Sequence, residues 1–404
     1  MKIGIIREGK TPPDKRVALS PTQCKQILDD YSDVKLVVQK SEIRKFKDQE
    51  YANLGVPLVD SVADCDVLIG VKEVPIDELI PNKKYIFFSH TFKKQPYNRE
   101  LLNAILDKNI QLIDWEVITN KKGQRLIAFG RYAGIVGAYN GFLAYGKKKG
   151  TYNLKAAHEC EDRAEMESQL DHVVLPDNFR LVITGSGRVG GGAIETISCM
   201  PQIKEVSPED YLAKNFDHPV YTVLNVEDYN RSKDGSAFDK KQFYSNPSDK
   251  FESNFMPFGL KSDMYIACHY WDNKAPYIFT REDAKHKDWK IEVVADVSCD
   301  IDCAVACTIE PSTVADPIYG YNPQIEAKDD FMKEGVIAVM AVDNLPCELP
   351  KDASVDFGIM FLEHVLNPLR GLDPDQVIER ASETKDGKLT SHFAYLQDYI
   401  EGKE

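Results

Sequence analysis

The sequence predicts an α/β fold of two Rossmann-like, doubly wound domains with a cleft between them. Short apolar runs rich in Ile and Val alternate with helix-like segments along most of the chain, which is typical of parallel sheets with crossover helices. One apolar run leads through a glycine-rich turn into a helix, as in dinucleotide-binding domains. With 404 residues the chain is also too long for a single ordinary core, because domains typically hold about 100–200 residues.

The first domain is predicted over residues 1–135. Ser20 and Pro21 mark the start of a helix that reaches Asp30, because Ser caps the free N–H groups of a first turn and Pro has no N–H to leave unpaired there. Apolar runs and helical segments then alternate. The predicted strands cover residues 3–6, 34–38, 66–70, 85–89 and 110–113, and further helices cover residues 48–54 and 99–107.

The second domain is predicted over residues 136–349, entered through a long helix at residues 132–145 that is mostly small and apolar. Residues 225–258 are rich in Asp, Lys, Ser and Asn and lack apolar periodicity, so they predict a surface excursion. Two helices, over residues 353–366 and 391–400, end the chain. The predicted strands of the second sheet cover residues 179–184, 219–224, 264–267, 291–295 and 335–342.

The charge balance argues against nucleic acid as a partner. The chain has 50 Lys and Arg residues against 64 Asp and Glu residues, a formal net charge of −14 that repels a polyanion. Arg7 interrupts the apolar start of the chain, which leaves no room for a signal peptide, and no later run approaches the ~18 apolar residues of a membrane span. We therefore expect a cytoplasmic protein without membrane attachment. Assembly into a homo-oligomer stays open.

The chain has nine cysteines, an odd number without a tight framework, which indicates buried thiols in a reducing compartment rather than disulfides. Cys299, Cys303 and Cys307 recur every four residues and would approach one metal ion if their segment were helical. No Cys-x-x-Cys pair or neighbouring His completes a set of four ligands. The sequence therefore predicts no metal site, and the role of these three thiols stays open.

The glycine-rich turn is the strongest local signal of function. Glycine is needed because the turn is tight, the pyrophosphate approaches the backbone closely and the following helix points its free N–H groups at the phosphate. The alternative is a glycine-rich turn in an α/β domain that binds no ligand. The residues of this Gly-x-Gly-x-x-Gly motif, predicted to bind NAD or NADP, are Gly185, Ser186, Gly187, Arg188, Val189 and Gly190.

The choice between NAD and NADP depends on an acid about 20 positions beyond the motif. Residues 205–210 read Glu-Val-Ser-Pro-Glu-Asp at the end of the next predicted strand. NADP is tolerated if Ser207 or Pro208 meets the ribose, whereas NAD is preferred if Glu209 does. The sequence does not set this register, so both cofactors stay open.

Lys72 and His90 follow two predicted strands of the first domain, at the position where open α/β sheets place their ligand crevices. A lysine whose pKa is lowered by desolvation or nearby cations can accept a proton at neutral pH, and a histidine can do so unperturbed. Arg16, Arg125 and Arg131 are candidates to clamp carboxylates bidentately. Each residue taken singly also has an ordinary structural explanation: Lys72 as a surface lysine, His90 as a hydrogen-bonded histidine of the core, and the arginines as members of surface ion pairs.

Several motifs together carry a specific resemblance. Lys72 lies in Gly-Val-Lys-Glu, His90 lies in Phe-Ser-His-Thr, and residues 125–134 read Arg-Leu-Ile-Ala-Phe-Gly-Arg-Tyr-Ala-Gly. In these motifs the chain resembles the lysine-forming saccharopine dehydrogenases, in particular the lysine–2-oxoglutarate reductase portion of aminoadipic semialdehyde synthases, within the alanine dehydrogenase and transhydrogenase superfamily. The likeness extends nearly end to end, from Arg-Val-Ala-Leu-Ser-Pro at residues 16–21 to Val-Asp-Asn-Leu-Pro at residues 342–346.

The resemblance implies an oxidoreductase that converts saccharopine, water and NAD(P)+ reversibly into lysine, 2-oxoglutarate and NAD(P)H through an imine. Lys72 is the implied base for the amine proton, and His90 is the implied acid/base for the addition of water. Residues 350–404 are implied to complete the first domain, which binds the substrate. The implied substrate-binding residues are Arg16, Gln95, Glu116, Arg125, Phe129, Ser298, Cys299 and Asp300, and the further implied cofactor-binding residues are Tyr270, Val297, Val342, Asp343, Asn344 and Leu345.

Two departures from the family pattern bear on these expectations. First, no ribose-binding acid can be identified after the second strand of the cofactor domain. Second, Gln124 occupies the position where some relatives carry a second arginine. Two alternatives therefore stay open: an alanine dehydrogenase-like enzyme and a dinucleotide-binding protein without catalysis. Saccharopine carries three carboxylates where alanine carries one, so Arg16, Arg125 and Arg131 favour the larger substrate.

Overall fold

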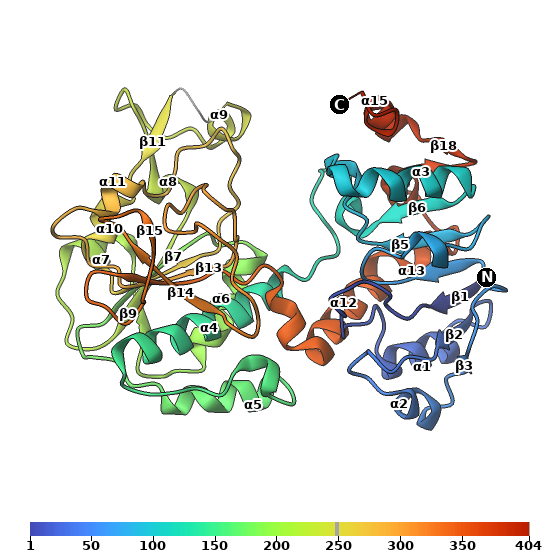
Figure 1. Ribbon diagram of the computed structural model, residues 1–404, viewed down its shortest axis with the longest axis horizontal. Coiled ribbons are helices and arrows are strands. Elements are labelled where there is room, and N and C mark those ends of the chain that lie inside the picture. The colour runs from blue at the N-terminus through green and yellow to red at the C-terminus, as the bar shows by residue number, and fades with distance from the viewer. Residues whose placement is uncertain (247–249, 404) are drawn as a thin grey trace. The chain divides into compact units, whose positions relative to one another are not determined.

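A computed structural model describes residues 1–246 and 250–403 and divides the chain into two compact units (Figure 1). Unit 1 contains Met1–Phe129 and Pro350–Glu404, and unit 2 contains Gly130–Leu349. Each unit is built around its own mainly parallel sheet with its own hydrophobic core. The predicted α/β class is confirmed, and each predicted strand is present within two residues at either end.

The sheet of unit 1 has six strands in the order β3-β2-β1-β4-β5-β6, and all neighbours are parallel. Most strand residues are buried, which explains why the strands read as continuous apolar runs rather than alternating ones. Only β3 was not predicted, because it has just two residues. The strands are β1 Lys2–Ile5, β2 Lys35–Gln39, β3 Leu58–Val59, β4 Val67–Ile69, β5 Lys84–Phe87 and β6 Gln111–Asp114.

The C-terminal segment belongs to unit 1 and pairs with β6, where the N–H of Glu383 donates to the carbonyl of Leu112 at 2.8 Å. Figure 1 shows this segment in orange and red alongside the blue and cyan elements of the unit. Residues 391–400 form a 3₁₀ helix followed by one α-helical turn, not the continuous helix that was predicted. The helices are α1 Pro21–Asp30, α2 Asp48–Asn53, η1 Ile76–Glu78, η2 Thr91–Lys93, η3 Pro96–Asn98, α3 Arg99–Asp107, η4 Trp115–Val117, α12 Pro350–His364, α13 Leu366–Leu369, α14 Val377–Ala381, η8 Ser391–Leu396 and α15 Gln397–Ile400, and the short strands are β17 Thr384–Lys385 and β18 Lys388–Leu389.

The sheet of unit 2 has eight strands in the order β15-β14-β16-β13-β12-β7-β9-β8. Its strands from β16 to β8 are parallel, while β14 and β15 are antiparallel additions that the sequence did not predict. The strands are β7 Arg180–Thr184, β8 Lys204–Glu205, β9 Val220–Leu224, β12 Met264–Ala267, β13 Val293–Asp296, β14 Ile318–Asn322, β15 Ala327–Asp329 and β16 Ile337–Met340, with a separate pair of β10 Asn230–Ser232 and β11 Phe251–Ser253.

Helix α4, Gly130–Lys149, is continuous, and the second unit begins at its first residue rather than at residue 136. Glycines let α4 lie very close to α6, Arg188–Ser198. A Cβ on Gly134 would come within 1.8 Å of the Val189 carbonyl, and a Cβ on Gly192 would come within 2.0 Å of the Arg131 carbonyl. The other helices of unit 2 are η5 Ala157–Glu159, α5 Arg163–Ser168, η6 Gln169–His172, α7 Pro208–Ala213, α8 Val226–Tyr229, α9 Lys240–Ser245, α10 Met256–Gly259, α11 Arg281–Ala284 and η7 Leu345–Glu348.

The prediction of a surface excursion at residues 225–258 is wrong for most of the segment, and residues 247–249 lie outside the described residues. The segment contains three short helices and both strands of the β10–β11 pair. Its apolar residues are spaced irregularly, yet they enter the core of unit 2 because short turns direct successive aromatic rings inward. The buried rings are those of Tyr229, Phe243, Phe251, Phe255 and Phe258.

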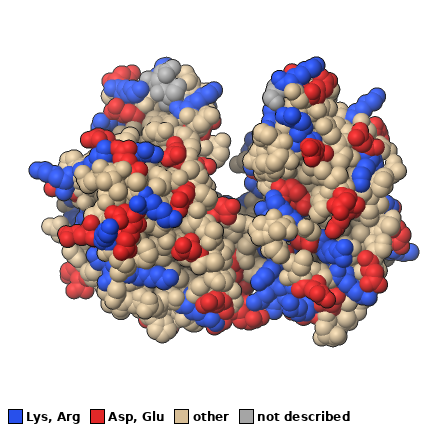
Figure 2. All heavy atoms as spheres, viewed as in Figure 1, with Lys and Arg blue, Asp and Glu red and all other residues tan. Residues whose placement is uncertain are grey.

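In the described part of the chain, no helix combines the length and the apolar character needed to cross a lipid bilayer. On the face drawn in Figure 2, Lys and Arg side chains are interspersed with Asp and Glu side chains.

Candidate active site

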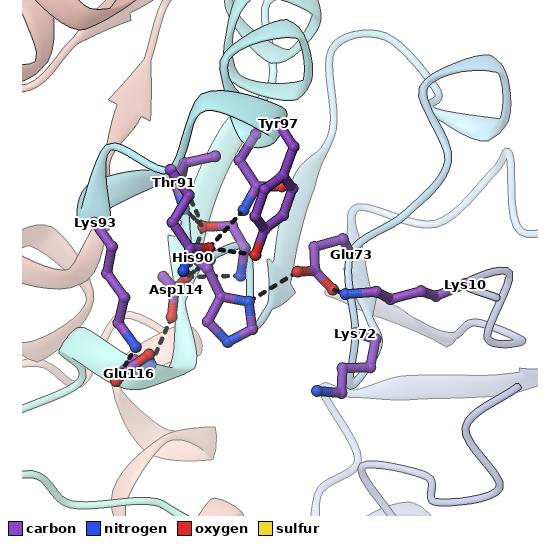
Figure 3. Close-up of polar contacts among 12 residues, drawn as sticks. Lys10, Lys72, Glu73, His90, Thr91, Lys93, Tyr97, Asp114 and Glu116 are labelled. Atoms are coloured by element: carbon purple, nitrogen blue, oxygen red, sulfur yellow. Dashed lines mark hydrogen bonds and ion pairs between the residues drawn. The ribbon is translucent and has the colours of Figure 1, made fainter. Parts of the chain in front are cut away.

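The carboxyl ends of β4 and β5 bring Lys72, Glu73 and His90 to one edge of the unit 1 sheet (Figure 3). Nδ1 of His90 lies 2.8 Å from Oε1 of Glu73, and Nζ of Lys10 donates to Oε2 of the same carboxylate at 2.7 Å. Burial opposes ionisation of Glu73, but the hydrogen bonds from His90 and Lys10 outweigh it and lower its pKa to about 2. An ionised Glu73 only accepts hydrogen bonds, so Nδ1 of His90 carries the proton and Nε2 is left for chemistry.

The backbone of Lys72 is held by a second buried carboxyl. Oε1 and Oε2 of Glu8 accept the N–H groups of Val71 at 2.7 Å and of Lys72 at 2.8 Å. Burial raises the pKa of Glu8 to about 8. The indole N–H of Trp115 donates to the carbonyl of Gly70 at 2.8 Å, so the strand end that carries Lys72 is fixed from two sides.

Arg16 and Phe129, both predicted to bind substrate, are in contact in unit 1. The guanidinium of Arg16 lies 4.2 Å from the centroid of the Phe129 ring and forms a 2.6 Å ion pair with Asp14. Both charged side chains are only 3% exposed. Burial opposes ionisation of Asp14, but the adjacent Arg16 outweighs it and lowers the Asp14 pKa to about 2. Part of the charge of Arg16 is therefore already matched within the protein.

Arg125, Glu116 and Gln95 also lie in unit 1. Nη1 of Arg125 lies 3.8 Å from Oε1 of Glu116, an oxygen that also pairs with Nζ of Lys93 at 2.8 Å. The Arg125 side chain is 34% exposed, so it is more open to a ligand carboxylate than Arg16 is. The side-chain oxygen of Gln95 accepts a hydrogen bond from the Tyr97 hydroxyl.

The sequence analysis missed several residues of this site. Asp114 is the last residue of β6 and directly follows the strand predicted at residues 110–113, just as Lys72 and His90 follow β4 and β5. This position at a strand end could have identified it as a candidate site residue. Glu8 and Lys10 follow the first predicted strand and offered the same signal, whereas Glu383 had none, because only the fold brings it to these strand ends. Glu383 in particular comes from the C-terminal segment and is fully buried.

In unit 2, the glycine-rich turn joins β7 to α6 as predicted. Gly185 has φ +91°, and a Cβ there would come within 2.7 Å of the Cys268 carbonyl. A Cβ on Gly190 would come within 2.0 Å of the Gly185 carbonyl, so the turn requires glycine at both positions. Gly187, in contrast, is the N-cap of α6 and faces open space. The helix N-terminus is therefore accessible to an anion, which fits a dinucleotide pyrophosphate.

The expected place of the ribose contact is corrected by the strand order. The neighbour of β7 is β9, not β8, so a dinucleotide ribose is expected after Leu224 rather than at residues 207–209. Ser207 is instead the N-cap of α7 and accepts the N–H of Asp210 at 3.1 Å. After β9 comes Asn225, whose Oδ1 accepts a 2.6 Å hydrogen bond from the Ser186 hydroxyl in the glycine-rich turn.

The remaining predicted residues of unit 2 follow β12, β13 and β16, which are parallel neighbours, so they share the carboxyl edge of the sheet with the glycine-rich turn. Tyr270 is 81% exposed. Ser298 donates its hydroxyl to buried Asp296 at 2.6 Å, and Cys299 adopts a left-handed conformation with φ 53°. Those residues after the three strands are Tyr270, Val297, Ser298, Cys299, Asp300, Val342, Asp343, Asn344 and Leu345.

The cysteine cluster and Arg131, two further candidates from the sequence, have bonding partners within unit 2. The segment from Cys299 to Cys307 is not helical, and the thiols of Cys299 and Cys303 bond separate backbone carbonyls, those of Ala341 and Ile301. Among the described residues, no group of three or more His, Cys, Asp or Glu side chains could hold a metal ion. Arg131 is engaged bidentately by Glu195 within unit 2, at 2.7 and 2.8 Å.

Comparisons with known proteins match this arrangement. Residues 4–136 match the family model described as alanine dehydrogenase/PNT, N-terminal domain. A solved L-alanine dehydrogenase structure superposes with a TM-score of 0.66 at 15% identity and covers 100% of both chains, which shows a shared fold.

Curated relatives extend the likeness along the chain. The saccharopine dehydrogenase [NAD(+), L-lysine-forming] of Schizosaccharomyces pombe is 28% identical over 400 residues, covering 94% of this chain and 96% of that protein. The alpha-aminoadipic semialdehyde synthase of Arabidopsis thaliana is 28% identical over 441 residues, covering 98% of this chain but only 41% of that protein. The mitochondrial synthase of Mus musculus is 26% identical, and the chain covers 48% of it, so the chain spans less than half of these synthases. The chain is thus similar along its length to saccharopine dehydrogenases and alpha-aminoadipic semialdehyde synthases, and its residues 4–136 match the N-terminal domain of the alanine dehydrogenase/PNT type.

Proposed function

We propose that this enzyme converts saccharopine and water into lysine and 2-oxoglutarate, reversibly, with a nicotinamide dinucleotide as the redox partner. Unit 1 is the proposed substrate domain and unit 2 the proposed dinucleotide domain. The observation that carries the proposal is the pairing of His90 with Glu73 beside Lys72 at two adjacent strand ends. Amine oxidation followed by imine hydrolysis needs proton transfer at both steps, and this arrangement supplies two separate groups for it.

Lys72 is the proposed base that removes the proton from the secondary amine as the hydride leaves the neighbouring carbon. A nicotinamide dinucleotide bound at the glycine-rich turn supplies the hydride acceptor. His90 then takes a proton from the water that adds to the imine carbon and returns one to the departing amine. Because Glu73 holds the proton on Nδ1 of His90, Nε2 performs both transfers.

The substrate carboxylates are proposed to meet the cations of unit 1. Arg125 is the stronger candidate, because its side chain is 34% exposed, whereas that of Arg16 is 3% exposed. Arg16 adds positive electrostatic potential and packs on Phe129, although Asp14 already neutralises part of its charge. Gln95, Glu116 and the segment from Ser298 to Asp300 keep the substrate-binding roles that the resemblance implies.

We propose NAD rather than NADP as the cofactor. The segment after β9 carries Asn225, Glu227 and Asp228, and Asn225 is already joined to the glycine-rich turn through Ser186. Glu227 is exposed, with Nζ of Lys240 3.7 Å from its carboxylate. A carboxylate at this strand end accepts hydrogen bonds from a ribose 2′-hydroxyl and repels a 2′-phosphate. Glu227→Ser should therefore narrow the preference for NADH over NADPH.

The decisive experiment follows the absorbance of reduced nicotinamide with purified protein, NADH or NADPH, 2-oxoglutarate, and lysine, alanine or ammonia in turn. Oxidation that requires both lysine and 2-oxoglutarate supports the proposal and identifies the cofactor. Oxidation with pyruvate and ammonia would assign an alanine dehydrogenase-like activity instead. If every pair is inactive while NADH still binds, the chain is a dinucleotide-binding protein without catalysis.

Variants separate the two proton-transfer roles from general damage. Lys72→Met and His90→Asn should each lower kcat by about 10²–10⁴-fold while cofactor binding persists. Lys122→Met, which removes an exposed lysine in a turn of the same unit, is the matched control and should leave kcat unchanged.

A further inference from the structure

Four fully buried polar side chains lie beneath the turn that carries His90. They are Ser89, Thr91, Asp114 and Glu383, each 0% exposed. Glu383 reaches this place from the C-terminal segment, which is joined to β6 by the bond from its N–H to Leu112 and by the bond from the N–H of Leu112 to the Thr384 hydroxyl at 3.0 Å. None of the four has a role in the proposed reaction.

Asp114 holds the backbone of the turn. Its Oδ2 accepts the N–H groups of Ser89 at 2.7 Å and of His90 at 3.2 Å, and its Oδ1 accepts the N–H of Glu116 at 2.6 Å. Bonds from three backbone donors favour the ionised form of a carboxyl. His90 itself sits at φ 55°, a left-handed conformation that is costly for a residue with a side chain. The turn therefore depends on Asp114 to keep this conformation.

Counting hydrogens indicates that one carboxyl of the cluster is protonated. Three contacts of 2.6 Å link the cluster in a row: Oδ2 of Asp114 to the Ser89 oxygen, the Ser89 oxygen to the Thr91 oxygen, and the Thr91 oxygen to Oε2 of Glu383. Each contact needs one hydrogen, and the two hydroxyls supply only two, so a carboxyl supplies the third. The oxygens of Asp114 already accept three N–H groups, so this hydrogen belongs on Oε2 of Glu383. The other oxygen, Oε1, lies 3.1 Å from the Ser89 oxygen.

The surroundings of Glu383 agree with this assignment. Burial first, and then the negative charge of Asp114, raise the pKa of Glu383 to about 8. The other titratable groups that face the pair are His90 on the turn, Tyr395 on η8 and Tyr399 on α15. The two tyrosine hydroxyls donate to backbone carbonyls of Phe92 and Gln95, and the cations nearest their rings are Lys94 and Arg99.

We propose that Glu383 is a positioning residue for His90: in its protonated form it donates to Thr91, so that Thr91 donates to Ser89 and Ser89 donates to ionised Asp114, and the row of bonds holds the His90 turn in its left-handed conformation. Loss of that proton would place two negative carboxyls at the ends of two buried hydroxyls, and the turn would shift to separate them. The catalytic consequence rests on the proposed function, whereas the protonation of Glu383 does not.

Infrared spectroscopy of carboxyl groups tests the protonation without any turnover. We expect the carbonyl stretch of protonated carboxyls in the wild type at neutral pH to contain a component that is lost as the pH rises through the pKa of Glu383 and that is missing from Glu383→Gln, while the component from Glu8 is present in both. Glu379→Gln, which changes an exposed carboxyl on α14, is the matched control and should keep the band. If the band is the same in wild type and Glu383→Gln, Glu383 is ionised and the proposal is overturned.

Kinetics test the positioning role. Glu383→Gln keeps a neutral, hydrogen-bonding side chain, so it should retain kcat at neutral pH. In the wild type, kcat should fall as Glu383 loses its proton at alkaline pH, and this part of the fall should be absent from Glu383→Gln. Glu383→Ala leaves Thr91 without this partner and should lower kcat by roughly tenfold to a hundredfold with little change in KM. Equal losses in the two variants would contradict positioning by a protonated carboxyl. If the wild type has no activity but the infrared band behaves as expected, the proposed function fails while the protonated Glu383 stands.

Discussion

The carboxylate of Glu73 joins His90 to Lys10: one oxygen lies 2.8 Å from Nδ1 of His90 and the other accepts a hydrogen bond from Nζ of Lys10 at 2.7 Å. The three side chains come from segments that follow β5, β4 and β1, so the arrangement exists only at the carboxyl edge of the assembled sheet. Lys10 balances the negative charge of Glu73, and Glu73 in turn orients the imidazole.

Replacing Glu73 by Gln should lower kcat by roughly tenfold to a hundredfold, less than removing His90, because an amide no longer dictates which ring nitrogen carries the proton. The pH profile of kcat, measured with the lysine and 2-oxoglutarate assay, checks this expectation. Glu78→Gln, an exposed carboxyl on η1, is the control. An unchanged kcat in Glu73→Gln would show that the tautomer of His90 does not limit turnover.

Arg16→Met should lower the free energy of unfolding by about 3–5 kcal/mol, because it removes the ion-pair partner of a buried carboxylate. The pKa of Asp14 is lowered from 3.8 to about 2, so this ion pair stabilises the fold fully above pH 3.8, and the contribution is lost as the pH falls toward 2. Urea unfolding at several acidic pH values checks both statements. In Asp14→Asn the stability should depend less on pH over this interval than in the wild type.

Gly187→Ala should weaken dinucleotide binding without unfolding the chain. A Cβ at residue 187 meets no atom within 4 Å, so the protein accommodates it, yet it stands at the N-terminus of α6 where phosphate oxygens would approach. Gly191→Ala is the matched control, since its Cβ is equally unobstructed but lies within the helix. Titration of NADH, followed by its fluorescence, should show weaker binding for Gly187→Ala alone. Equal affinities for the two variants would place the phosphates elsewhere.

The stability of the wild type should fall as the pH rises from 4.5 toward 8. Burial raises the pKa of Glu8 from 4.5 to about 8, so the folded chain keeps a proton that the unfolded chain has released, and the stabilisation present below pH 4.5 is lost as the pH passes 8. One such proton contributes a slope of at most about 1.4 kcal/mol per pH unit. Glu8→Ala should be less stable but show a shallower slope in urea unfolding across this interval. An identical slope would mean that Glu8 is ionised in the folded protein.

Much of the architecture follows from local sequence signals. Ser20 and Pro21 predicted the start of α1, and the structure confirms Ser20 as the N-cap, whose side chain accepts the N–H of Gln23. The apolar runs predicted the long strands because buried parallel strands are apolar on both faces. The signals failed where an element is two or three residues long, as in β3 and β15, or where turns rather than periodicity bury aromatic rings, as with Phe243 and Phe251.

The sequence by itself determined where the candidate residues lie along the chain: Lys72 and His90 after their strands, and the glycines from Gly185 to Gly190 between strand and helix. Only the tertiary structure decided what those residues meet, because strand order and the return of the C-terminal segment are set by packing between distant parts of the chain. It placed β9 beside β7, which moves the expected ribose position from residues 207–209 to the segment after Leu224. It also brought Lys10 to Glu73 and Glu383 to Ser89, since burying these polar groups is tolerable only where each finds a hydrogen-bonding partner.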